Sequence, residues 1–158
     1  MRRATGTFGT FMSMEFTGSL TYPIYANLIA ATVAALIGAR PQEVVFTSGA
    51  TESNNLAVLG AVDGSGPAKR HVIVSEVEHF SVMNALIPLR NAGCPVTVLP
   101  VDRDGLVDPA AVRKAIRPDT ALVSVMHANS EIGTIEPVEE VGKVAREHGA
   151  TFHVDATA

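Results

Sequence analysis

The sequence contains one cysteine, Cys94, no tryptophan, and aromatic residues at only 5%. A single cysteine can form no internal disulfide and cannot by itself build a zinc site, so we expect no metal centre and a reducing, cytoplasmic setting. We interpret Cys94, which lies between Gly93 and Pro95 just before a predicted strand, as a structural residue. With so few aromatic residues, the core must be built from aliphatic side chains.

Charge and long apolar runs are also sparse. The net charge is −4 and no basic stripe is present, which argues against a nucleic-acid partner. The most apolar stretch, residues 24–37, includes Asn27 and Thr32 and is shorter than the roughly 20 residues that span a bilayer. No apolar run follows Arg2 and Arg3 directly, so we expect no signal peptide. These absences predict a cytoplasmic protein that binds neither membrane nor nucleic acid.

The sequence does contain enough apolar material for one folded domain, with 158 residues of which 47% are hydrophobic and 18% charged. Short runs rich in β-branched residues alternate with segments of helical spacing. The predicted strands are residues 44–47, 71–75, 96–100, 121–126 and 151–155, and a helix is predicted after each of the first four. Apolar strands that alternate with helices predict an α/β fold with three α/β/α layers and a mostly parallel sheet.

This regular alternation begins near residue 41, so we expect residues 41–158 to form the main domain. Residues 1–40 contain one predicted helix, at 25–37, and no recognisable opening strand. The helix predicted from Pro109 has a strong start signal, because Asp108 can cap it and proline suits the first helical position.

Polar residues follow four of the predicted strands, at the point where each strand ends. They are residues 48–55, 76–79, 127–131 and Asp155. Because parallel strands share one carboxyl edge, where ligands bind in open α/β sheets, these clusters should meet at a common site. This shared location is the strongest functional signal that the residues themselves give.

The first cluster combines a glycine turn with a helix start. Gly49 permits a tight turn, and Ala50 and Thr51 open a predicted helix whose free amides and positive dipole end suit a phosphate. Thr51 adds a hydroxyl donor. The same residues fit an ordinary helix cap on a surface turn, and without a lysine the loop is not a P-loop.

His79 and Asp155 also allow two interpretations each. His79 is either a hydrogen-bonded loop histidine or an imidazole that faces a flat cofactor ring and moves a proton. Asp155, if buried, needs a cationic partner, which can be an arginine or a protonated pyridine nitrogen. Asn129 and Ser130 fit simple turn residues as well as a ligand site.

Together these segments resemble a known family. Residues 47–57, Thr-Ser-Gly-Ala-Thr-Glu-Ser-Asn-Asn-Leu-Ala, resemble the cofactor-phosphate loop of cysteine desulfurases, within the class V aminotransferases. Residues 75–79 resemble their ring-stacking histidine segment, residues 126–134 their asparagine-rich loop, and residues 153–157 their aspartate strand. Each motif alone is weak, but their order and spacing agree from residue 33 to the end, and the combination is highly specific.

The resemblance implies pyridoxal 5′-phosphate (PLP) as cofactor, used as an electron sink. Ala50 and Thr51 would bind its phosphate, and His79 would stack on its ring as the catalytic residue. Ser130 occupies the position that contacts the ring hydroxyl, and Asp155 would pair with the pyridinium nitrogen. The implied reaction converts L-cysteine to L-alanine and an enzyme persulfide, which supplies sulfur for iron–sulfur clusters or thio-cofactors.

Departures from the family pattern shape a further expectation. Family members usually have a second asparagine where Ser130 follows Asn129 here. The lysine that holds PLP covalently, the persulfide cysteine, the substrate-carboxylate arginine and a small C-terminal domain lie beyond the aspartate strand, and Lys69, Lys114 and Lys143 do not match that lysine. We therefore expect a large-domain fragment that is inactive alone and binds PLP non-covalently at best. It would act as a homodimer or with a complementary C-terminal polypeptide.

Other functions stay open at this point. The chain can be a segment of another class V aminotransferase or lyase. It can also be a non-catalytic remnant or pseudoenzyme α/β module. Ser130 favours this, and so does Ala158, which stands where the family usually has glutamine. A flavodoxin-like phosphate or nucleotide binder would explain the strand–helix alternation but not the specific motifs.

Overall fold

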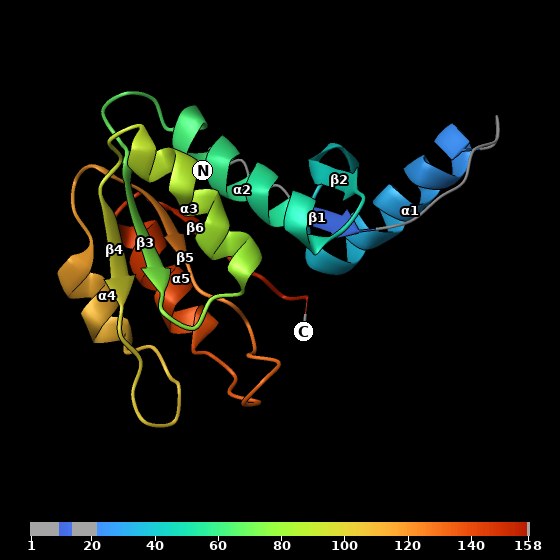
Figure 1. Cartoon of the computed structure of the whole chain (residues 1–158). Coiled ribbons are helices and arrows are strands. Elements are labelled where there is room, and N and C mark those ends of the chain that lie inside the picture. Colours follow the sequence, from blue (N-terminus) through green and yellow to red (C-terminus); the bar gives the residue numbers. More distant parts are fainter. Residues whose placement is uncertain (1–9, 14–21, 158) are drawn as a thin grey trace. The chain divides into compact units, whose positions relative to one another are not determined.

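The computed structural model describes residues 10–13 and 22–157 (Figure 1). The chain divides into two compact units, one ending at Ser53 and the other beginning at Asn54. The predicted boundary at residue 40 lies earlier, because η1 (Pro41–Glu43) and β2 (Val44–Thr47) pack with the preceding helix within the first unit.

The first unit contains a two-stranded parallel sheet and one long helix. β1 (Thr10–Ser13) pairs in register with β2, with Thr10 opposite Val44. The helix α1 (Tyr22–Ile37) packs Ala30 and Ala34 against Val44 in a small core. The helix and β2 were predicted, but β1 was not: its four residues show no alternation, and the strand is defined by pairing with a segment more than 30 residues away.

The second unit is built on a four-stranded parallel sheet with the order β4-β3-β5-β6. Its strands are β3 (His71–Ser75), β4 (Val96–Leu99), β5 (Thr120–Ser124) and β6 (Thr151–His153). Its helices are α3 (Phe80–Asn91), α4 (Pro109–Ala115) and α5 (Val138–Glu147), together with most of α2 (Ala50–Gly64). The strand–helix alternation and the parallel sheet predicted from the sequence are confirmed.

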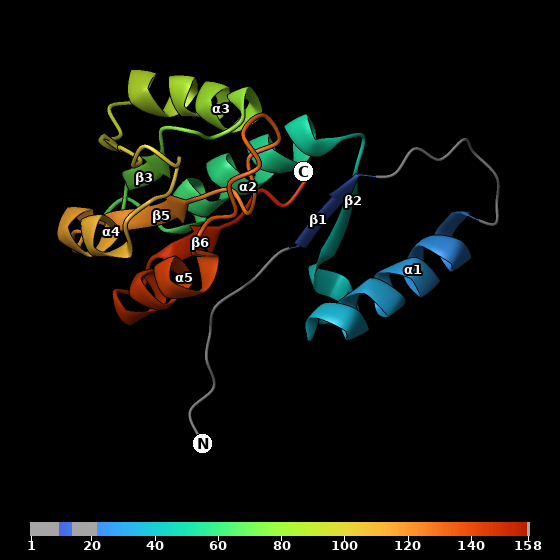
Figure 2. The same ribbon diagram turned by 90° about the horizontal axis from the view of Figure 1, so that it is seen from below.

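Helices cover both faces of this sheet. Val72 and Val74 of β3 join a core formed with α2 and α3, whereas their neighbour Ile73 joins a second core formed with α4 and α5. Figure 2 shows α3 on one side of the sheet and α5 on the other. Every residue of β3 and of β5 is buried, which explains why both strands read as continuous apolar runs. The predicted three-layer architecture is therefore confirmed.

Local signals place the ends of several elements. Asp108 caps α4 by accepting a hydrogen bond from the Ala110 amide at 2.8 Å, and Pro109 occupies the first helical position, as predicted. On α5, Gly142 packs against the Phe152 ring so closely that an added Cβ would lie 2.9 Å from Phe152 Cδ1. None of the helices among residues 22–157 is long and apolar enough to cross a membrane.

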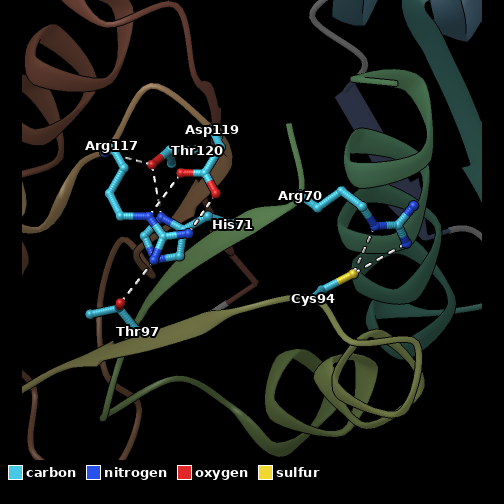
Figure 3. Close-up of polar contacts among 7 residues, drawn as sticks. All are labelled: Arg70, His71, Cys94, Thr97, Arg117, Asp119 and Thr120. Atoms are coloured by element: carbon cyan, nitrogen blue, oxygen red, sulfur yellow. Dashed lines mark hydrogen bonds and ion pairs between the residues drawn. The ribbon is translucent and has the colours of Figure 1, made fainter. Parts of the chain in front are cut away.

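A buried polar cluster lies where the strands begin, at the edge opposite the predicted site (Figure 3). His71 is fully buried, with Nδ1 2.8 Å from Thr120 Oγ1 and Nε2 2.8 Å from Thr97 Oγ1. Arg117 pairs with Asp119 beside it, and its backbone amide donates to Thr120 Oγ1 at 2.8 Å. The imidazole therefore links the starts of β3 and β5 to β4.

Replacing His71 by glutamine is expected to lower the free energy of unfolding by about 2 kcal/mol near pH 7, because the two hydrogen bonds of the buried imidazole lose their geometry. Burial, aided by the charge of Arg117, lowers the pKa of His71. Below about pH 6.5 the unfolded wild-type chain then takes up a proton that the folded chain does not, so the stability of the wild type falls. The difference in free energy of unfolding between the wild type and the variant therefore narrows. Urea unfolding across pH measures the gap, with exposed His148→Gln as control. A gap that widens on acidification would contradict the assignment.

A separate pair at the same edge accounts for the only cysteine of the sequence. Cys94 is buried beside β4, and its sulfur accepts hydrogen bonds from Nε and Nη2 of Arg70 at 3.3 and 3.2 Å (Figure 3). This arrangement agrees with the structural role predicted for Cys94.

Candidate functional site

Three of the predicted polar clusters meet at the carboxyl edge of the four-stranded sheet. Beyond β5 and β6 the backbones stay paired, because the His127 amide donates to the Asp155 carbonyl oxygen at 2.8 Å. The segment after β3 joins them, since Asn129 Nδ2 donates to the Val77 carbonyl oxygen at 3.2 Å. The sequence prediction that these strand ends share one location is confirmed within the second unit.

A chain of side-chain hydrogen bonds connects His79 to Asp155 across this edge. His79 Nδ1 lies 2.8 Å from Ser81 Oγ. Asn54 Nδ2 donates both to Ser81 Oγ and to Asp155 Oδ2, at 2.8 Å each. Asn54, Ser81 and Asp155 are buried, whereas His79 is exposed. The two residues proposed from the sequence are thus joined by two that the sequence did not single out.

Asp155 is a buried carboxylate that stays ionised. Burial by itself would raise the pKa of Asp155, but hydrogen bonds from Thr157 and Asn54 outweigh it and hold the pKa below its usual range. Thr157 contributes both its hydroxyl, at 2.6 Å from Asp155 Oδ1, and its backbone amide, at 3.0 Å. The ion pairs found among the described residues are Arg40–Glu43, Arg103–Asp104, Arg113–Glu147 and Arg117–Asp119. None of them reaches Asp155, so the carboxylate suits a cationic group on a ligand.

His79 is the N-cap of α3 as well as a candidate ligand contact. Its Nδ1 accepts a hydrogen bond from the Ser81 backbone amide at 3.1 Å, which satisfies one of the free amides at the start of the helix. The Phe80 ring lies edge-on to the imidazole with a centroid distance of 6.4 Å. Both interpretations made from the sequence are therefore compatible: capping fixes one ring nitrogen and leaves the other for a ligand.

Glu78 is a second buried carboxyl group at this edge, and it behaves in the opposite way to Asp155. Burial raises the pKa of Glu78 to about 7, against the lowering effect of hydrogen bonds from Ser75 and the Met126 amide. Those bonds measure 2.7 Å each and tie the end of β3 to the end of β5. Glu78 thus holds the strand ends that carry His79 on one side and the Asn129 loop on the other.

The loop after β5 is shaped by Asn129 rather than by Ser130. Asn129 Oδ1 accepts from the backbone amides of Glu131 and Ile132 at 2.9 and 3.2 Å, which closes a tight turn. Ser130 lies exposed within this turn. Its contact with a cofactor hydroxyl stays a prediction.

The predicted phosphate loop belongs to the first unit. Ala50 and Thr51 form the first turn of α2, as predicted. Glu52 accepts hydrogen bonds from the Ser48 amide at 2.7 Å and the Ser48 hydroxyl at 2.6 Å, which fixes the loop before the helix. That Ala50 and Thr51 bind the phosphate of a ligand shared with His79 and Asp155 stays a prediction.

The three lysines of the chain lie outside the segments that carry His79, Asn129 and Asp155. Lys69 donates to the Gly149 carbonyl oxygen at 2.7 Å, next to the start of β6 and so at the edge opposite His79. Lys114 lies on α4 and Lys143 on α5, on the helices that the sequence predicted.

The aminotransferase class V family matches residues 17–158. The chain belongs to this family. It is 49% identical over 124 residues to the cysteine desulfurase IscS of Dictyoglomus turgidum, covering 78% of this chain and 32% of that protein. It is 51% identical over 124 residues to the mitochondrial cysteine desulfurase of Arabidopsis thaliana, covering 78% of this chain and 27% of that protein. The chain spans about a third of the length of the curated relatives it matches.

Solved structures also share its fold. SspA in complex with cysteine matches with a TM-score of 0.78 and 42% identity, over 85% of this chain and 39% of that one. DndA from Streptomyces lividans matches with a TM-score of 0.79 and 41% identity, over 88% of this chain and 40% of that one. The class V aminotransferases and the cysteine desulfurases are PLP-dependent. The residues at the carboxyl edge of the sheet can therefore be compared with the chemical groups of PLP.

The residues at this edge of the second unit fit PLP. A buried, ionised carboxylate stabilises a protonated pyridine nitrogen, and Asp155 is such a carboxylate, outside the ion pairs of the described residues and with the neighbouring His153 also attracting its charge. The exposed His79 offers an imidazole face and one further ring nitrogen. Asn54, Glu78 and Ser81 were not predicted as site residues, although Asn54 and Glu78 lie inside the segments that resemble the family.

Proposed function

We propose that the chain forms the front part of the PLP-binding domain of a cysteine desulfurase. The observation that carries the proposal is the buried Asp155 carboxylate, ionised, outside every ion pair of the described residues, and joined by hydrogen bonds to His79. Identities near 50% to cysteine desulfurases favour this activity over other class V reactions.

Each site residue then has a physical task. Asp155 would pair with the ring nitrogen of PLP and favour its protonated form, which would draw negative charge away from the substrate carbon. His79 would lie against the ring and could hold or move a proton at Nε2. Ala50 and Thr51 offer the amides and hydroxyl of a helix start to the phosphate, and Ser130 lies in the loop that would meet the ring hydroxyl.

When bound, PLP supplies an electron sink for bonds at the substrate carbon. The proposed substrate is L-cysteine, with alanine as product and the sulfur passed to a protein thiol for iron–sulfur clusters or thio-cofactors. We place the reaction in the cytoplasm. The proposed partner is a second copy of the chain or a polypeptide that supplies the covalent lysine and the persulfide cysteine.

A polypeptide of these 158 residues, supplied with PLP and L-cysteine, is expected to form alanine no faster than PLP in buffer. None of its lysines belongs to a motif for holding the cofactor, and Lys69 is bound at the opposite edge of the sheet. Alanine and sulfide release, measured by mass spectrometry and a colorimetric assay, test this expectation. The intact IscS of Dictyoglomus turgidum serves as the positive control.

A complementation assay then tests the desulfurase assignment itself. The chain is mixed with a polypeptide carrying the remaining part of that IscS, and alanine formation should rise above the level of either polypeptide alone. Turnover by the 158-residue chain alone would overturn the expectation of an incomplete site. Failure of the mixture, under conditions where the two matching pieces of the IscS itself are active together, would count against the desulfurase proposal.

A further inference from the structure

The hydrogen bonds between Asp155 and His79 have only one consistent direction. An ionised carboxylate only accepts, so the Asn54 atom that faces Asp155 Oδ2 must be its amide nitrogen. The second hydrogen of that nitrogen goes to Ser81 Oγ. Because Ser81 Oγ accepts there, its own hydrogen is available for His79 Nδ1 at 2.8 Å.

The direction of the hydrogen bond at His79 is fixed in the same way. The Ser81 backbone amide also points at His79 Nδ1, and an amide N–H can only donate. Nδ1 is therefore an acceptor, and the neutral imidazole carries its proton on Nε2. The nitrogen that His79 presents to a ligand is thus a donor.

We propose that Asn54 is a positioning residue for the cofactor: one side-chain nitrogen holds the Asp155 carboxylate and, through the Ser81 hydroxyl, the His79 imidazole. The inference rests on the proposed function only in naming PLP as the group that both residues meet. Asn54 comes from α2, Ser81 from α3, and Asp155 from the segment after β6, so one amide joins three elements. The two residues would be aligned before PLP arrives, which reduces the ordering cost of binding.

The neighbouring Asn55 provides a matched control. It lies on the same turn of α2 and also approaches α3, with Nδ2 3.5 Å from the Ser81 backbone carbonyl oxygen. Its Nδ2 bond goes to the backbone of Ser81, whereas the Asn54 bonds go to the Ser81 hydroxyl and to Asp155. Asn55→Ala therefore removes an asparagine from the same turn of α2 and leaves the Asn54 amide in place.

The first experiment needs no cofactor. The pKa of Asp155 is measured by carboxyl-carbon NMR in the wild type, in Asn54→Ala and in Asn55→Ala. A hydrogen bond from Asn54 helps to lower that pKa, so it should rise in Asn54→Ala and stay unchanged in Asn55→Ala. An unchanged pKa in Asn54→Ala would overturn the inference. If Asn54→Ala does not fold, Asn54→Gln, whose amide lies one methylene further from the backbone, replaces it.

The second experiment measures PLP affinity by equilibrium dialysis. Asn54→Ala should weaken binding roughly tenfold, and in an Asp155→Asn background the same change should have little further effect, because Asn54 acts through Asp155. Additive losses in the double variant would overturn the positioning role. If no form binds PLP, the proposed function fails, while the Asp155 titration still decides the role of Asn54.

Discussion

Replacing Glu78 by glutamine should raise the free energy of unfolding at about pH 8 by roughly 3 kcal/mol, since burial raises the pKa of Glu78 from 4.5 to about 7. At that pH the wild type must keep a charged carboxylate in a site that is almost fully shielded from water. Glutamine retains an oxygen for the Ser75 hydroxyl and the Met126 amide, so the strand ends stay tied. The variant should therefore lose the cost of the charge and keep the contacts.

The pH dependence gives this prediction its sign. The folded chain binds the Glu78 proton more tightly than the unfolded chain does. The contribution of protonated Glu78 to the free energy of unfolding is therefore fully present below about pH 4.5, and it is lost as the pH rises through about 7. The gap between Glu78→Gln and the wild type should grow over this window. Urea unfolding at a series of pH values measures it, with exposed Glu76→Gln as control. A constant gap, or a variant less stable at high pH, would contradict the burial argument.

Replacing Asp155 by asparagine is expected to weaken PLP binding about 100-fold, as losing a buried ion pair costs about 3 kcal/mol or more. The pyridine nitrogen would lose the charge that keeps it protonated. The new amide group would also face the donors of Asn54 and Thr157, which already point at this position. Both effects act against the bound cofactor.

Equilibrium dialysis of PLP against each variant measures this loss directly. Asp119→Asn, which removes a carboxylate paired with Arg117 at the opposite edge of the sheet, is the matched control and should bind as the wild type does. Circular dichroism checks that Asp155→Asn remains folded. An affinity within about threefold of the wild type, less than 1 kcal/mol, would show that Asp155 does not meet the ring nitrogen.

The two buried carboxyl groups at this edge, Glu78 and Asp155, differ in pKa because their surroundings differ. Glu78 and Asp155 are both buried, yet the pKa of Glu78 rises to about 7 and that of Asp155 falls. Hydrogen bonds outweigh burial at Asp155, whereas burial outweighs them at Glu78. Near neutral pH, Asp155 is thus the permanent charge, and Glu78 is a partly protonated link between the strands.

Much of the fold could be predicted because its signals are local. Apolar runs marked β3 and β5, Asp108 and Pro109 marked the start of α4, and the parallel arrangement placed the polar strand ends at one edge. β1 had no such signal, since its definition comes from pairing with β2. The boundary between the two units has no local signal either, because the packing of β2 against α1 leaves no trace in composition.

The candidate site could be predicted only in part for the same reason. His79 and Asp155 were found because they end strands and match a family pattern. Asn54 and Ser81 were not, since their roles depend on contacts between residues 27 and 101 positions apart. Nothing in the local sequence says that a helix asparagine will meet an aspartate from the last strand.

In the proposed site, Asp155 keeps the ring nitrogen of PLP protonated. The most direct measurement is nitrogen NMR of PLP labelled at that atom, bound to the wild-type chain and to Asp155→Asn at a pH where free PLP has largely lost the proton. The wild type should show a protonated ring nitrogen, and the variant should not. Equal signals in both chains, or an unprotonated nitrogen in the wild type, would show that Asp155 does not control the protonation of the ring.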